Sequence, residues 1–391
     1  MVASDPRETR MAKSPNQPYL PQLDHLRAAA ALLIFFYHGF QLFSAPLEYG
    51  RSWSMGLWLH TDNPLLALLV EGHTAVAIFF VMSGFILTRG ALPHLGQGKR
   101  LLHGPFILNR ILRTYPLYIF LLLLGAYTHL DLFTLRGLVQ TVLPLYNLPG
   151  ALELDWFTAI FWAVAVLFQF YLLFPFVVRF LHKQGTRPLW LMMAAFMAGR
   201  FACLAMGAGA RDLAYLTLVG RMDQFLLGML AAVVYASLDE RRMRRLAWSL
   251  IPALGATIAA VYVFHRLGGW PAEAWWKLLW VTAEGALWAW VMLAYIAAGD
   301  SWKKGRLSRG LSWLGRLSFS IFLIHLVVMA IINKLSWHLH PTGNGYIDAF
   351  ATTALAALPI TLAAAMLAHH GIERPFLGLR MRYFSEIENE S

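Results

Sequence analysis

Long apolar runs, each about as long as a lipid bilayer is thick, dominate this sequence of 391 residues. An α-helix needs roughly 20 residues to cross the hydrocarbon core, where only helices and closed barrels satisfy all their backbone hydrogen bonds. About ten runs are long enough, at 26–45, 64–88, 106–127, 157–181, 189–206, 213–237, 246–264, 275–298, 314–337 and 347–369. We therefore predict an all-α integral membrane protein, a bundle of about ten transmembrane helices.

The composition agrees, because 58% of the residues are hydrophobic and only 14% are charged. Soluble domains are about half apolar and a quarter charged. We expect a tail at 1–22, a transmembrane domain at 23–376 and a tail at 377–391. The first tail lacks the apolar core of a removable signal peptide, so the first span is expected to remain. The single cysteine, Cys203, excludes an intramolecular disulfide and a Cys-based zinc site, and we expect no metal.

The positive charge is distributed unevenly along the chain, whose formal net charge is +11. Lys and Arg gather in alternate connecting segments, at 89–105, 182–188, 238–245, 299–313 and after 370. Cytoplasmic loops carry such an excess, which predicts that both termini are cytoplasmic. The same bias accounts for the charge without nucleic acid as a partner. One apolar stretch, 138–148, is too short to cross and carries Pro144, so we interpret it as partly inserted or superficial.

The first span carries two polar residues that face the same neighbour. Arg27 and His38 are eleven residues apart, which on a helix is about three turns and about 16 Å of height. Arg27 then lies near the cytoplasmic surface and His38 near mid-membrane. A histidine at that depth needs a partner or a cavity. It is either a structural residue bonded to another helix or a general base, and we favour the base because imidazole accepts protons near neutral pH.

Other polar residues in the apolar runs allow two interpretations each. Arg110 and Arg113 share a helix face and form either a cationic anchor or, with Arg27, a phosphate site. Ser83, next to a glycine, indicates either close helix packing or a hydroxyl that lines a site. Arg221 and Asp223 also lie within an apolar run and indicate either an internal charge pair or a site-lining arginine.

Taken in order, these segments resemble the acyltransferase-3 family of multi-spanning membrane acyltransferases, from Leu23 to Phe376. The most specific matches are the arginine and histidine of the first span, the Phe-Phe-x-x-Ser-Gly-Phe sequence at 79–85, and the arginine pair of the third span with Tyr115 and Pro116. Weaker matches are Gln169 to Pro175 with Tyr171, Gly220-Arg221 with Gly228, Leu314 to Ser320 with His325, and Ile372 to Phe376.

The resemblance implies transfer of an acyl group, most often acetyl, from cytoplasmic acyl-CoA to a hydroxyl of a cell-envelope or exported glycan or a related metabolite. It implies a protein of the bacterial inner membrane, with acyl-CoA, a hydroxylated acceptor and the lipid bilayer as partners. Our hypothesis is that the phosphates of acyl-CoA bind to the three arginines and that His38 is the general base. Further residues are expected to line the substrate or stabilise the intermediate, namely Ser83, Gln169, Tyr171, Arg221 and His325.

Two departures from the family pattern leave alternatives open. Members usually carry an acid just before Gln169, where this chain has Leu167 and Phe168, and often an acid at the position of Ala77. Either another residue replaces these acids or activity is weakened. The competing interpretations are a transporter or flippase of a glycan or lipid, to which intramembrane charges are equally suited, and an inactive relative.

Overall fold

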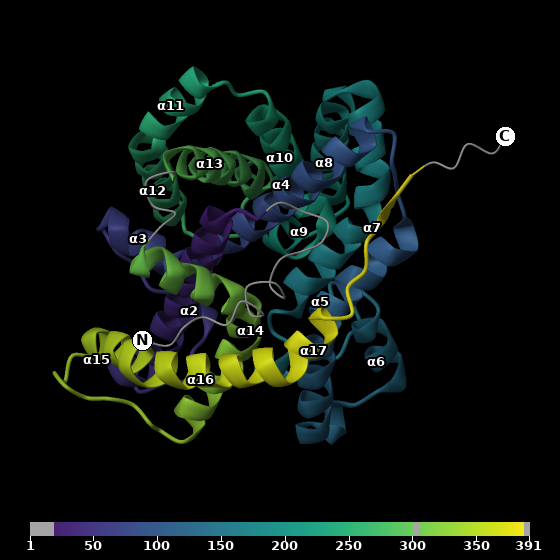
Figure 1. Cartoon of the computed structure of the whole chain (residues 1–391). Coiled ribbons are helices and arrows are strands. Elements are labelled where there is room, and N and C mark those ends of the chain that lie inside the picture. Colours follow the sequence, from purple (N-terminus) through teal and green to yellow (C-terminus); the bar gives the residue numbers. More distant parts are fainter. Residues whose placement is uncertain (1–18, 300–304, 387–391) are drawn as a thin grey trace.

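The structure, a computed structural model, describes residues 19–299 and 305–386 and is almost entirely helical (Figure 1). Most of the predicted first tail, part of the last one and the basic residues Lys303 and Lys304 lie outside the described residues. The helices are α2 (Pro21–Tyr49), α3 (Pro64–Val70), α4 (Ala75–Gly96), α5 (His103–Thr128), α6 (Leu135–Val142), α7 (Phe161–Gln184), α8 (Arg187–Ala205), α9 (Ala210–Leu216), α10 (Leu218–Ala236), α11 (Glu240–Trp248), α12 (Leu250–Arg266), α13 (Lys277–Ala298), α14 (Arg306–Lys334), α15 (Gly345–Ala351), α16 (Leu358–Ala368) and α17 (Arg374–Leu377).

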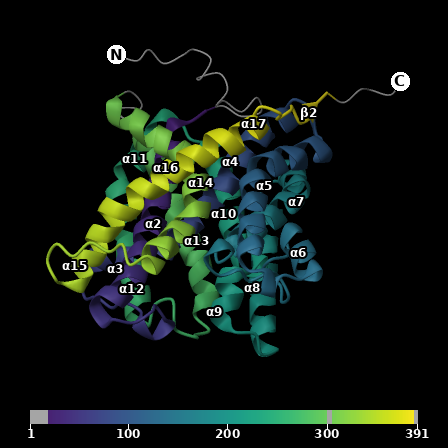
Figure 2. The same ribbon diagram turned by 90° about the horizontal axis from the view of Figure 1, so that it is seen from below.

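Helices long and apolar enough to cross a membrane account for most of the described chain. There are 9 of them, or up to 10 if the bent pair α11 and α12 is one span. This confirms the predicted all-α bundle of about ten spans. The helices run between two ends of the molecule, with α17 at one end and α3 and α9 at the other (Figure 2).

Several predicted spans are not straight helices. The run at 64–88 is divided into α3 and α4 by a 3-10 turn at Gly72–Thr74, and the run at 213–237 is divided into α9 and α10. The helices α11 and α12 meet at 43°. The last span contains π-helical turns at Thr352–Ala357 and His369–Glu373. Hydropathy measures only the length of an apolar run, so it does not reveal these breaks.

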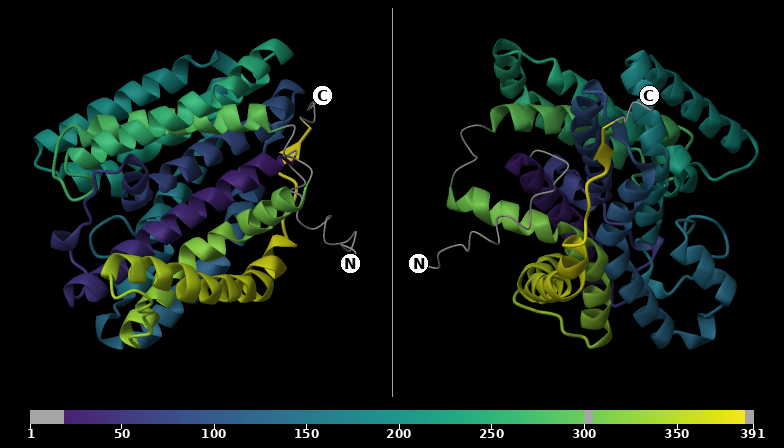
Figure 3. Two further views of the ribbon diagram at one scale, coloured as in Figure 1. Left: turned by 90° about the vertical axis from the view of Figure 1, so that its left-hand side faces the viewer. Right: turned by 45° about the vertical axis from the view of Figure 1, so that its right-hand side comes forward.

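Two close helix pairs form the centre of the bundle, α2 against α14 and α4 against α10 (Figure 3). Small residues permit the second approach. A Cβ atom added at Gly84 of α4 would lie 2.1 Å from the carbonyl oxygen of Phe225, and one at Gly228 of α10 would lie 2.0 Å from that of Val81. The structure therefore favours the packing interpretation of the Ser-Gly pair in the second span.

The stretch predicted as partly inserted lies beside the middle of two spans. The hydroxyl of Tyr115 donates to the carbonyl oxygen of Val142 at 2.8 Å, and the amide of Gln169 donates to that of Pro144 at 2.6 Å. Tyr115 and Gln169 belong to the interiors of α5 and α7. The segment therefore reaches back along the bundle rather than lying only on its end.

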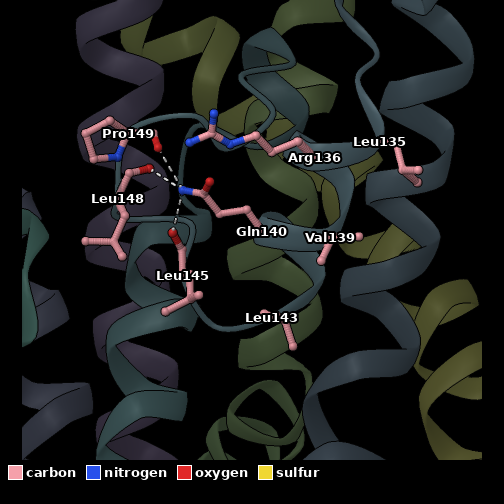
Figure 4. Close-up of a pocket in the computed structure, with 8 residues that line it drawn as sticks. All are labelled: Leu135, Arg136, Val139, Gln140, Leu143, Leu145, Leu148 and Pro149. Atoms are coloured by element: carbon pink, nitrogen blue, oxygen red, sulfur yellow. Dashed lines mark hydrogen bonds between the residues drawn. The ribbon is translucent and has the colours of Figure 1, made fainter.

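Residues of α6 and of the loop that follows it line an open cavity of about 640 Å³, whose walls are mostly apolar. Gln140 holds this loop, since its amide nitrogen donates to the carbonyl oxygens of Leu145, Leu148 and Pro149 (Figure 4). None of the site residues expected from the sequence lines this cavity.

Candidate active site

Two imidazole rings from distant parts of the chain meet inside the bundle. Nδ1 of His38 on α2 lies 2.9 Å from Nε2 of His325 on α14, although 287 positions separate the residues. The contact follows from the packing of α2 against α14. The sequence predicted His38 as a base and His325 only as a lining residue, so their direct hydrogen bond is a new feature.

The hydrogen bonds around His325 determine which ring nitrogens carry protons. Nδ1 of His325 lies 3.1 Å from the carbonyl oxygen of Ile321 and 2.7 Å from that of Phe322. Carbonyl oxygens only accept hydrogen bonds, so this nitrogen carries the proton and Nε2 of the neutral ring is an acceptor. His38 must then donate from Nδ1. Its own Nε2 keeps the lone pair, as a general base requires.

The two histidines differ in their exposure. His325 is 0% exposed, whereas His38 keeps some accessible surface although it lies deep in the protein. The rings of Tyr37 and Phe35 border the pair, at centroid distances of 4.5 Å from His38 and 6.3 Å from His325 respectively. His38 is thus the more accessible of the two rings, and His325 is buried against it.

Arginine side chains gather near the start of α2. Arg27 forms an ion pair of 2.6 Å with Asp24, and its side chain is 26% exposed. Arg113 of α5 lies close enough to Arg27, Arg380 and Arg110 for their positive charges to repel its own. The structure therefore brings the three predicted arginines together and adds a fourth.

The fourth arginine comes from the C-terminal segment, which the sequence predicted only as a tail. A short antiparallel ribbon of β1 (Arg100–Leu101) and β2 (Phe384–Ser385) ties this segment to the start of α5. Asn109 strengthens the attachment through two hydrogen bonds to the backbone of Met381, of 2.6 and 3.0 Å. Burial lowers the pKa of Arg380, and the charge of Arg110 lowers it further. No local pattern in the sequence marks this arginine.

Three of these arginines have no carboxylate partner. Within 19–299 and 305–386, no ion pair involves Arg110, Arg113 or Arg380, and Nε of Arg110 is buried without a hydrogen-bond acceptor. The guanidinium of Arg110 lies over the rings of Phe106 and Tyr171, at 5.3 and 5.6 Å. Unpaired guanidinium groups that gather at one place suit an anionic ligand such as a phosphate.

Two other predicted residues use their polar groups within the protein. Ser83 donates its hydroxyl to the carbonyl oxygen of Phe79 at 2.8 Å, within its own helix. The amide nitrogen of Gln169 donates to the carbonyl oxygen of Pro144 and, at 2.9 Å, to the side chain of Asn147. Gln169 therefore holds the inserted segment in place. Within the part of the chain that the structure describes, the hydroxyl of Tyr171 forms no hydrogen bond.

The interpretation of Arg221 and Asp223 as a pair with each other is wrong. Arg221 forms a buried ion pair of 3.0 Å with Glu284 on α13, and Asp223 pairs at 2.5 Å with Arg200 on α8. Residues two apart on a helix point in nearly opposite directions, so neighbouring helices supply the partners. These pairs link α8, α10 and α13, and their location favours a structural role.

The positions where the family usually has acids are apolar and packed. Ala77 is 0% exposed within the main core, and Leu167 packs against the same core. A carboxylate in place of Ala77 would therefore be buried in this core. In this chain, backbone carbonyl oxygens orient His325, and His325 orients His38.

The bundle thus contains a hydrogen-bonded pair of histidines and a cluster of four arginines, three of which have no carboxylate partner among the described residues. Comparison with known proteins gives its class, since the sequence profile of a family described as "Acyltransferase domain" matches residues 20–369. The chain belongs to this family, the acyltransferase-3 family, and is a membrane O-acyltransferase.

Two curated relatives are similar over almost the whole chain. Acyltransferase MdmB of Streptomyces mycarofaciens is 26% identical over 395 residues, which cover 92% of each protein. A putative peptidoglycan O-acetyltransferase of Bacillus subtilis, YrhL, is 25% identical over 411 residues; the match covers 95% of this chain but 57% of the relative. No solved structure matches this chain significantly.

Proposed function

We propose that this protein transfers an acyl group, with acetyl as the expected group, from cytoplasmic acyl-CoA to a hydroxyl of a glycan or a related metabolite. One observation carries the proposal. The hydrogen bond to His325 leaves the lone pair of His38 on Nε2. His38 also lies in the same helix as Arg27, about 16 Å away along the helix axis.

The arginine cluster is the proposed donor site. Arg27, Arg110, Arg113 and Arg380 present positive charge at the helix ends, and three of them lack carboxylate partners among the described residues. In acyl-CoA, phosphates stand at one end and the thioester at the other, joined by a long and weakly polar arm. With the phosphates on the arginines, the arm would reach into the bundle and bring the thioester to His38.

The proposed chemical step uses His38, the hydroxyl of the acceptor and the thioester of acyl-CoA. Nε2 of His38 accepts the proton of the acceptor hydroxyl while the oxygen attacks the thioester carbonyl carbon. The tetrahedral intermediate collapses with cleavage of the carbon–sulfur bond, and His38 returns the proton to the thiolate, which leaves as CoA. Of the three donors considered for the intermediate, Ser83 and Gln169 are already engaged, and the ring of Tyr171 lies under the guanidinium of Arg110 in the arginine cluster.

The acceptor is proposed to arrive from the opposite end of the bundle. The N-terminus is expected to be cytoplasmic, in a bacterial inner membrane, so α3 and α9 would face the outside. Acyl groups would then cross the membrane while CoA itself stays on the cytoplasmic side. The name of YrhL refers to peptidoglycan, which makes a cell-envelope glycan a reasonable acceptor to test. A transporter or an inactive relative is disfavoured by the family match and the oriented lone pair.

The base is tested by His38→Ala in purified protein. We expect release of CoA and acyl transfer from acetyl-CoA to fall by about 10² to 10⁴, the usual contribution of a general base. Full activity at unchanged membrane abundance would rule out His38 as the base.

The donor site is tested by Arg110→Ala and Arg380→Ala. Each should raise the KM for acetyl-CoA about tenfold, while kcat changes little. Arg244→Ala is the matched control, because this exposed arginine on α11 also belongs to a basic connecting segment but lies outside the cluster. An equal response of all three variants would point to a general effect of surface charge.

A further inference from the structure

The segment that follows α6 places irregular backbone at the periphery of a bundle that crosses a membrane. Residues 143–154 contain no helix and no strand, and Figures 1 and 2 show α6 at the outside of the bundle, beside α5. Backbone groups that face lipid without hydrogen-bond partners are strongly unfavourable. The segment is therefore stable in a bilayer only if the protein itself binds its carbonyl oxygens.

Side chains of α5, α6 and α7 bind these oxygens. The hydroxyl of Tyr118 donates to the carbonyl oxygen of Thr141 at 2.7 Å. Tyr115 and Gln169 bind two of the carbonyl oxygens that follow, and Gln140 binds three more in the loop. Because these polar backbone atoms are paired within the protein, the apolar side chains of the segment are free to form an outer wall.

This wall lines the open cavity of about 640 Å³ described above. Leu135 and Leu148, two of its lining residues, are 70% and 51% exposed, so no other part of the described chain covers them. The volume lies within the range of about 300 to 1,000 Å³ that is usual for ligand sites. Since the walls are mostly apolar, the occupant that suits them is a hydrocarbon chain.

Arg136 is the charged residue among those that line the cavity. Within residues 19–299 and 305–386 it forms no hydrogen bond and no ion pair. A Cβ atom added at Gly150 would lie 4.0 Å from its Nε and Nη2 atoms, and Figure 4 shows its guanidinium directed toward Pro149. An unpaired cation therefore borders the apolar wall, and guanidinium groups bind phosphate particularly well.

The charge and the apolar wall are arranged along the bundle as the parts of a membrane lipid are. The start of α5 lies beside the ribbon of β1 with β2, so α5 ends, and α6 begins, toward the end of the bundle away from α17 (Figure 2). From Arg136, in the first turn of α6, the helix rises about 10 Å to Leu143. Leu143 is close to Val142, whose carbonyl oxygen binds Tyr115 in the interior of α5. The cation is thus nearer the membrane surface, and the wall extends inward from it.

We propose that this cavity binds one phospholipid, with its phosphate on Arg136 and an acyl chain along the wall formed by α6 and the loop that follows it. The inference is independent of the proposed function, because none of the expected site residues lines the cavity. The lipid would complete the packing of a segment that joins α5 to α7.

The test compares dioleoylphosphatidylglycerol with dioleoylglycerol, which has the same chains but no phosphate. Delipidated protein in detergent is titrated with each lipid, and native mass spectrometry gives the Kd. We expect the phospholipid to bind at least tenfold more tightly. Equal affinities would mean ordinary contact with membrane lipid and would overturn the proposal. Tighter binding of undecaprenyl phosphate than of the phospholipid would also overturn it, in favour of a polyprenyl carrier.

The phosphate contact is tested by Arg136→Gln. The Kd for dioleoylphosphatidylglycerol should rise about tenfold, the loss of one charge-assisted hydrogen bond, while the Kd for dioleoylglycerol stays the same. Arg51→Gln is the matched control, because this exposed arginine also follows a span that ends away from α17 but does not line the cavity. An equal rise in both variants would assign the effect to net charge and contradict the proposed site.

The acyl-chain contact is tested by Val139→Trp, which puts an indole into the cavity from a residue that is 51% exposed. The variant should bind both lipids at least tenfold more weakly and melt like the wild type in the absence of lipid. Leu123→Trp is the control, since this leucine of α5 is 56% exposed and lies outside the cavity. Unchanged binding by Val139→Trp would show that the lipid does not occupy the cavity.

Discussion

At the scale of single residues, the proposed mechanism depends on which nitrogen of each imidazole carries a proton. The carbonyl oxygens of Ile321 and Phe322 place the proton of His325 on Nδ1, and this choice passes through one hydrogen bond to His38. A carboxylate usually performs such orientation in enzymes. Here uncharged backbone groups do so, which avoids burying an extra charge in the membrane.

The first prediction concerns this orientation. His325→Leu removes the acceptor for Nδ1 of His38, so the ring loses its fixed tautomer and kcat should fall about 10- to 100-fold. The KM for acetyl-CoA should stay the same, because the arginines are not affected.

His325→Gln is the matched control, since its amide oxygen can reach the position of Nε2. We expect it to recover part of the lost kcat. If the Leu and Gln variants were equally active, the hydrogen bond between the histidines would have no part in catalysis.

At the scale of elements, close helix contacts position the site. The contact of α2 with α14 brings the two histidines together. The contact of α4 with α10 depends on Gly84, whose place leaves no room for a side chain. Membrane helices associate through such packing because lipid offers little hydrophobic driving force.

The second prediction tests this contact. Gly84→Ala puts a methyl group against the backbone of Phe225 and should reduce the free energy of unfolding by about 1–3 kcal/mol. The melting temperature of the detergent-solubilised protein measures the change. Gly96→Ala, in the same helix with nothing within 4 Å of the added atom, is the control and should melt like the wild type.

At the scale of the whole molecule, the bundle has two chemically different ends. In Figure 2, α17 and β2 lie at one end of the molecule, and α3 and α12 lie at the other. Arg380 of the arginine cluster precedes β2, and an open cavity lined by His265 and Arg266 lies where α12 ends. A donor and an acceptor that approach from opposite ends would meet at His38. The orientation of the protein in the membrane would therefore decide from which side the donor and the acceptor arrive.

The third prediction concerns orientation. In a background with Cys203→Ala, Arg51→Cys at the end of α2 should react with a membrane-impermeant maleimide in intact cells. Gln97→Cys, in the exposed connection after α4, should react only after permeabilisation. The reverse pattern would show that the arginines face outward and would exclude cytoplasmic acyl-CoA as the donor.

Much of the site could be predicted because its most specific residues belong to local patterns. Arg27 and His38 share one helix face through simple periodicity, and Arg110 and Arg113 do so in another helix. Arg380 escaped notice because only the ribbon of β2 with β1, which is far away in the sequence, brings it to the cluster.

The sequence by itself determined that this chain crosses a membrane about ten times and carries a histidine deep in its first span, because the length of an apolar run and the pitch of a helix are local properties. Only the tertiary structure decided that His38 faces His325, that Arg221 pairs with Glu284, and that Gln169 holds the segment after α6. These contacts join residues far apart in the chain, and packing between helices, rather than the pattern within any one of them, selects which polar groups meet.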